Sequence, residues 1–144
     1  MAGLFLEDLS VGQSASRTWR VTEADIQGFA EVTGDHNPLH LDEAYAATTQ
    51  FKGRIAHGML SAGYISAVMG TQLPGEGAVY VAQTLNFKRP VRIGDEVTVD
   101  VTVASIDPAK NRTVLTTVCK VAGKVVVEGE ATAMVPRRPE ANAS

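Results

Sequence analysis

The sequence predicts an α+β protein in which an antiparallel β-sheet wraps around one long central helix. The segment from His57 to Leu73 carries no charged side chain, which is typical of a helix that other structure covers. The chain after Ala78 is rich in valine and threonine, which favour strands. Residues 97–103 alternate valine with polar residues, which predicts a sheet with one apolar face. Such a helix and sheet bury each other most simply when the sheet curls around the helix.

Length and composition predict a single domain. A chain of 144 residues builds one core, which we expect to span residues 1–136, with residues 137–144 as a flexible tail. Apolar residues make up 44% and charged residues 20%, which excludes wholesale disorder. The net charge of -3 gives no general attraction to polyanions, so we expect no nucleic-acid partner.

The apolar segments and the single cysteine predict where the protein works. No stretch approaches the length of a membrane span, and the first residues lack the basic start of a secretory signal. Cys119 cannot form an intrachain disulfide, and its apolar neighbours favour an inert, buried thiol. We therefore expect a reducing, cytoplasmic location and no membrane partner.

Local signals place the first strand and helix. We expect a strand over residues 16–21 and a helix after Thr22, whose side chain can cap the first turn. The helix should run to about Thr33, because Gly34 is placed as a C-terminal stop.

A rigid turn follows this helix. Pro38 pushes Asn37 into an extended conformation, so no helix runs through these two positions. Asp42 then caps a short helix over residues 43–48.

The second half of the chain changes from helix to sheet at the break formed by residues 73–75. We expect an antiparallel meander over residues 79–135, with a tight hairpin at Ala122-Gly123. The expected strands span residues 79–88, 97–103, 112–121 and 124–135.

Two residues of segment 34–42 are not explained by local structure. A helix stop, a turn and a helix cap account for Gly34, Asn37, Pro38 and Asp42, but not for Asp35 or His40. A carboxylate and an imidazole on either side of a rigid turn can reach one small volume and share a water molecule. The pair is therefore a candidate for acid–base catalysis.

Two other chemistries fit these residues less well. His36 and His40 have the spacing of a helical zinc pair, but Pro38 breaks the helix that such a pair needs. Since no cysteine or flanking glutamate completes the set, we expect no metal. A nucleophilic triad built on Ser61 or Ser66 lacks the glycine pattern that exposes such a serine at a strand elbow.

Gly58 is the second candidate site, because it lies where the uncharged helix begins. The first N–H groups of a helix have no intrahelical partner and attract negative charge. A residue without a side chain lets a substrate oxygen approach its amide closely. The alternative is that Gly58 only eases the packing of the helix.

Several stretches together resemble the MaoC-like (R)-specific enoyl-CoA hydratases, the short bacterial kind associated with polyhydroxyalkanoate precursor supply. They are residues 29–41 with the run GDHNPLH, residues 57–60 with the run HGML, and residues 80–91 and 94–97. The resemblance covers nearly all of residues 5–135.

The resemblance implies a hot dog fold, in which an antiparallel sheet wraps one long helix. It also implies a homodimer whose sheets join edge to edge, with acyl-CoA bound near the subunit boundary. The expected reaction is addition of water to trans-2-enoyl-CoA to give (R)-3-hydroxyacyl-CoA, which would link fatty acid β-oxidation to polyhydroxyalkanoate synthesis. The CoA thioester is the substrate, and no cofactor is implied.

The resemblance also assigns roles to residues. It makes Asp35 and His40 the catalytic pair, Asn37 the orienting residue beside them, and Gly58 the amide that receives the thioester carbonyl.

The remaining site residues concern the two ends of the substrate. Ser66, as an orienting residue, and Met69 fall on the helix face that resembles the acyl pocket of the family. Arg54, Lys88 and Arg89 are candidate contacts for the CoA phosphates, with solvated surface as the alternative.

Three other functions stay open on the sequence. A thioesterase on the same fold would also use an acidic residue and a helix-start amide. A 3-hydroxyacyl-carrier-protein dehydratase would run the same chemistry in reverse on another carrier. A non-catalytic subunit would bind acyl thioesters and complete the active site of another protein.

Overall fold

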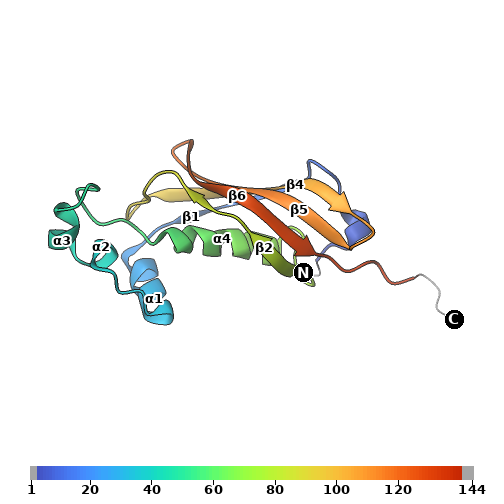
Figure 1. Ribbon diagram of the computed structural model, residues 1–144, viewed down its shortest axis with the longest axis horizontal. Coiled ribbons are helices and arrows are strands. Elements are labelled where there is room, and N and C mark those ends of the chain that lie inside the picture. The colour runs from blue at the N-terminus through green and yellow to red at the C-terminus, as the bar shows by residue number, and fades with distance from the viewer. Residues whose placement is uncertain (1–2, 141–144) are drawn as a thin grey trace.

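The computed structural model describes residues 3–140 and confirms the expected architecture. A six-stranded antiparallel sheet curls over the long helix α4, as in the hot dog fold (Figure 1). In chain order the elements are η1 (Leu6–Asp8), β1 (Ser14–Arg20), α1 (Glu23–Thr33), α2 (Pro38–Leu41), α3 (Glu43–Ala47), α4 (Gly58–Thr71), β2 (Val79–Gln83), β3 (Asn86–Phe87), β4 (Glu96–Asp107), β5 (Arg112–Val121) and β6 (Lys124–Met134).

The core lies between α4 and the concave face of the sheet. The four alternating valines of β4 at 97, 99, 101 and 103 are at most 1% exposed, while the residues between them face the polar side. From α4, Ile65 and Val68 are fully buried against this layer. Each such side chain contributes about 1.5–3 kcal/mol when buried, so the valine face fixes α4 beneath the sheet.

One face of α4 lies outside this core. Met59 is 53% exposed, and Gly63, Ser66 and Gly70 follow it along the same face. The sequence predicted a helix covered all round, and the structure of one chain covers it on one side only.

The strand order corrects the predicted meander. Only β4, β5 and β6 are consecutive neighbours, and the full order is β1-β4-β5-β6-β2, with β3 also paired to β6. The connection from β3 to β4 therefore crosses the sheet instead of turning back on itself. This leaves β1 and β2 as the two edges.

The predicted strand over residues 79–88 is divided into β2 and β3. The break falls at Thr84, whose backbone N–H donates to the Glu130 carbonyl, 2.9 Å away. The Thr84 hydroxyl accepts from the Glu130 N–H, also at 2.9 Å. Gly129 permits this close crossing, because a Cβ there would meet the Thr84 carbonyl.

Several predicted boundaries are confirmed. Thr22 and Asp25 form a capping box at the start of α1, and Gly34 ends the helix in the left-handed conformation, with φ 81°. Ala122 and Gly123, with φ 50° and 80°, form the two-residue hairpin between β5 and β6.

The chain beyond β6 is partly anchored. Arg137 hydrogen-bonds to the β4–β5 turn, and Arg138 hydrogen-bonds to Glu7 and pairs with Asp8. Of the predicted flexible tail, residues 141–144 lie outside the described residues. No helix within residues 3–140 has the length and apolar character needed to cross a membrane.

Candidate active site

The three short helices α1–α3 lie beside the N-terminal end of α4 and carry one half of the site (Figure 1). Gly34 turns the chain out of α1, so that Asp35 begins an exposed turn. The Asp35 N–H donates to the Thr33 hydroxyl at 3.1 Å, and its Oδ1 accepts from the Asn37 N–H at 3.2 Å. The carboxylate is thereby fixed by its own turn.

Asn37 connects this turn to the element that carries the imidazole. Its side-chain Oδ1 accepts from the Leu39 N–H at 3.0 Å and caps α2, the single helical turn that includes His40. Pro38 occupies the first position of α2, where its missing N–H costs nothing. Asn37 therefore orients both members of the predicted pair, one through its backbone and one through its side chain.

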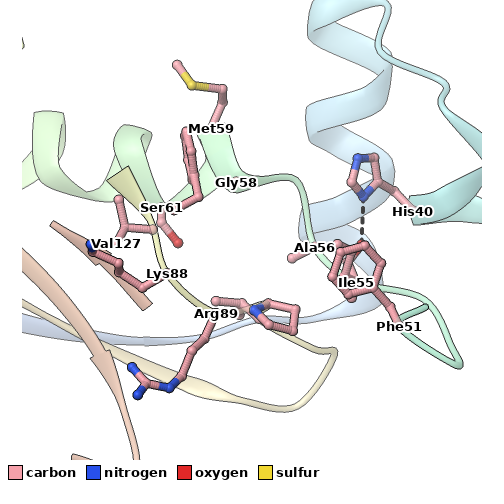
Figure 2. Close-up of a pocket in the computed structure, with 13 residues that line it drawn as sticks. His40, Phe51, Ile55, Ala56, Gly58, Met59, Ser61, Lys88, Arg89 and Val127 are labelled. Carbon is pink, nitrogen blue, oxygen red and sulfur yellow. Dashed lines mark hydrogen bonds between the residues drawn. The ribbon is translucent and has the colours of Figure 1, made fainter. Parts of the chain in front are cut away.

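The His40 ring is held by a backbone carbonyl. Its Nδ1 lies 2.7 Å from the backbone oxygen of Ile55. Figure 2 marks this hydrogen bond with a dashed line. Because a carbonyl only accepts, Nδ1 carries the proton, and Nε2 is left with the lone pair that a general base needs. Burial lowers the pKa of His40 below its usual 6.5, opposed by the hydrogen bond to Ile55. The neutral form is favoured.

His57 lies beside Asp35 and His40, and the sequence did not predict its position there. It is 2% exposed and packs against the His40 ring, with 4.0 Å between the ring centroids and 32° between the ring planes. Its Nε2 lies 3.0 Å from the backbone oxygen of Asp35. The available signal was its place directly before Gly58, as one of only three histidines in the chain.

Asp35, His40 and His57 also raise the question of a cation. One ligand atom from each lies within 4.8 Å of the others. The two imidazole rings are tilted by 32° with 4.0 Å between their centroids, and each lies with one ring nitrogen against a backbone carbonyl. Groups this close can also share protons, and the expected lack of a metal stays a prediction.

The start of α4 forms the other half of the site. The Gly58 N–H has no intrahelical partner and no hydrogen bond to any other described residue. Gly58 and His40 line the same pocket of about 410 Å³ (Figure 2). A Cβ on Gly58 would lie 2.7 Å from the Phe87 ring, so glycine is also required for packing. The amide and packing interpretations of Gly58 are therefore compatible.

The predicted acyl residues are separated from this pocket. Ser66 lines a second pocket of about 460 Å³, which shares Met59 with the first. Met69 is 3% exposed, belongs to the core and lines neither pocket.

The predicted phosphate contacts fall into two groups. Lys88 and Arg89 line the pocket of His40, where Lys88 lies 3.6 Å from Glu128 and Arg89 donates to a backbone carbonyl. Arg54 instead forms hydrogen bonds within the protein. Its guanidinium makes two hydrogen bonds of 2.7 Å to Glu23, and its Nε donates to the His40 carbonyl at 2.7 Å. Its side chain is 13% exposed, which points to an anchor for α2 and not to a free phosphate contact.

A carboxylate in an exposed turn and a buried neutral imidazole, near an unpaired helix-start amide on a hot dog scaffold, define a class of protein suited to proton transfer next to a developing oxyanion. Comparison with known proteins narrows this class. A model of the MaoC like domain matches residues 9–126, and the chain belongs to this family.

The relatives are similar over nearly their whole length. The chain is 60% identical over 134 residues to an (R)-specific enoyl-CoA hydratase of Rhodospirillum rubrum, covering 93% of each chain. It is 52% identical over 139 residues to a 3-hydroxybutyryl-CoA dehydratase of Methylorubrum extorquens, covering 96% of this chain and 88% of the relative. An unliganded R-hydratase of Pseudomonas aeruginosa superposes with a TM-score of 0.89 at 52% identity, covering 94% of this chain and 88% of that structure.

The anchoring role of Arg54 gives a first prediction. Arg54→Met keeps the aliphatic stem but removes every donor, and should lower the free energy of unfolding by about 1–3 kcal/mol at neutral pH. Arg20→Met is the matched control, because the Arg20–Glu96 pair is 64% and 60% exposed and should contribute little. Equal melting temperatures for the two variants would contradict the anchor.

The difference in stability between wild type and Arg54→Met should depend on pH in one direction. The hydrogen bonds from Arg54 lower the pKa of Glu23 from 4.5 to about 2. The contribution of the pair is therefore complete above pH 4.5 and is lost as the pH falls towards 2. The difference in melting temperature between wild type and Arg54→Met should therefore narrow over that interval, leaving the part that comes from the hydrogen bond to the His40 carbonyl.

Proposed function

We propose that this protein is an (R)-specific enoyl-CoA hydratase, which adds water to trans-2-enoyl-CoA and releases (R)-3-hydroxyacyl-CoA. The observation that carries the proposal is the grouping of Asp35 with His40, whose side chain lines the same pocket as Gly58. The similarity to named hydratases over more than nine tenths of the chain supports it. An R-hydratase of Aeromonas caviae involved in polyhydroxyalkanoate synthesis, 45% identical, supports the same metabolic setting.

The reaction makes three demands, and each has a group to meet it. Water oxygen must reach C3, a proton must reach C2, and negative charge gathers on the thioester oxygen between these steps. Asp35 and His40 hold the water and take its proton, and the same cluster returns a proton to C2. One ligand atom of each residue lies within 4.8 Å of the other, so the proposed proton movements belong to the pair. The Gly58 N–H stabilises the enolate oxygen by about 3 kcal/mol.

Water and substrate then meet on one face of the double bond. The base and the proton donor belong to the same cluster, so addition is syn. No step requires a cofactor, since the CoA thioester already activates its own C2–C3 bond. Lys88 and Arg89, in the wall of the pocket, are the proposed contacts for the CoA phosphates.

A dehydratase acting on acyl-carrier-protein thioesters is the second candidate. A relative named as such a mitochondrial enzyme from Solanum lycopersicum is 39% identical over 131 residues. Rates on matched CoA and carrier-protein substrates separate the two. Release of free CoA would instead identify a thioesterase, and unchanged substrate would favour a binding subunit.

We further propose that two chains form a homodimer along β2. This strand pairs only with β6 among the described strands, so its other edge is open, and Val79 and Val81 are 57% and 41% exposed. The uncovered face of α4 lies next to this edge and shares the second pocket with it. A second chain would bury both and close that pocket over the acyl chain.

A cytoplasmic location fits the state of the single thiol. Cys119 is free and fully buried, and burial raises its pKa to about 12. It therefore stays a thiol that packs in the core.

The activity itself is tested by the loss of enoyl-thioester absorbance with crotonyl-CoA. Wild type should yield the (R)-alcohol, whereas Asp35→Asn and His40→Gln should each lose about a hundred- to ten-thousandfold in kcat. His36→Gln, an exposed histidine in the same turn, is the control and should keep the rate. A wild-type protein that leaves crotonyl-CoA and longer enoyl-CoAs unchanged would refute the proposal.

The pH profile should show where His40 titrates. Since the neutral imidazole is required and burial lowers its pKa, kcat should hold at pH 6.5 and fall only at more acidic pH. An acid limb centred above 6.5 would contradict a buried, neutral base.

The dimer is tested by measuring mass in solution. Val81→Asp places a charge in the middle of the β2 edge and should reduce the mass from two chains to one of 15.2 kDa. Val32→Asp, on α1 and 82% exposed, should leave the dimer intact. A wild-type monomer, or a Val81→Asp dimer, would exclude this interface.

A further inference from the structure

His57 is a buried polar residue to which the hydration steps above assign no role. Its Nε2 lies 3.0 Å from the Asp35 carbonyl oxygen, and because a carbonyl only accepts, Nε2 carries the proton. Its Nδ1 then holds a lone pair, and this buried atom has no hydrogen-bond partner within residues 3–140.

Packing alone does not require an imidazole at this position. The ring lies between two others, 4.6 Å from Phe29 and 4.0 Å from His40, measured between centroids. A benzene ring would fill this space without burying an unpaired nitrogen. The side chain also makes no capping hydrogen bond to α4, although His57 is the N-cap residue. What remains specific to the imidazole is its N–H donated to Asp35.

That hydrogen bond joins the two halves of the site. Asp35 lies in an exposed turn whose other hydrogen bonds are local, to Thr33 and Asn37. The bond to His57 is the one that attaches this turn to the start of α4, where the next residue is Gly58. The same ring packs against His40 at a tilt of 32°, and this contact limits the orientation of the His40 imidazole.

We infer that His57 is a positioning residue, which holds Asp35 through its backbone carbonyl and His40 through the contact between their rings, so that both stay aimed at one water molecule near the Gly58 amide. The inference rests on the proposed hydratase function. Positioning errors of about 1 Å in reacting groups cost about a hundredfold in rate. The effect should therefore fall on kcat and leave substrate binding nearly unchanged.

Two substitutions separate the hydrogen bond from the ring. His57→Gln places an amide donor where Nε2 lies, and His57→Phe keeps a stacked ring without a donor. For crotonyl-CoA we expect His57→Phe to lose about a hundredfold in kcat with KM changed less than about twofold. His57→Gln should recover at least about tenfold of that loss. His36→Gln controls for removing a histidine from the exposed turn.

Two results would overturn the inference. One is a folded His57→Phe with wild-type kcat, and the other is equal loss in both variants, which would mean that the donor is irrelevant. If His57→Phe does not fold, two other measurements test the inference. They are the kcat of His57→Gln and the tautomer of His57 in the wild-type protein. Long-range ¹H–¹⁵N NMR should show a protonated Nε2 and a bare Nδ1, and the opposite tautomer would refute the inference. Because this spectrum needs no substrate, it tests His57 even if wild type proves inactive.

Discussion

The site depends on the burial of α4 against the valine face of the sheet. Because Ile65 and Val68 are fully buried, the helix is fixed beneath β4 and its first residues are fixed with it. Those first residues are His57 and Gly58, which supply a ring beneath the acid–base pair and an unpaired amide beside it. A sheet with a polar inner face would leave α4, and with it half of the site, without a fixed position.

Backbone carbonyls define the chemistry of both histidines. The Ile55 carbonyl takes the Nδ1 proton of His40, and the Asp35 carbonyl takes the Nε2 proton of His57. Each ring therefore donates one N–H to a carbonyl and keeps a lone pair on its other nitrogen. On His40 the lone pair is on the nitrogen that can serve as a base, while burial keeps the ring neutral. Arg54 stabilises the same region by binding the His40 carbonyl and Glu23 together.

The sequence was most informative where a residue type has a single local meaning. Gly34 and the Asn37-Pro38 turn were predictable because their conformations are restricted, and the restricted turn brought Asp35 and His40 together as candidates. Contacts distant in the chain were not predictable. The position of His57 under Asp35 depends on how α4 docks, the Arg54–Glu23 pair joins separate segments, and the pairing of β2 with β6 requires the chain to cross the sheet.

In the proposed mechanism one cluster, containing Asp35 and His40, delivers both water and proton to the same face of the substrate. Hydration of crotonyl-CoA in D₂O tests it most directly, because deuterium at C2 and the hydroxyl at C3 record the faces attacked. Proton coupling constants of the product should show the syn diastereomer alone. A product with anti stereochemistry, or a mixture of both diastereomers, would contradict delivery from a single cluster.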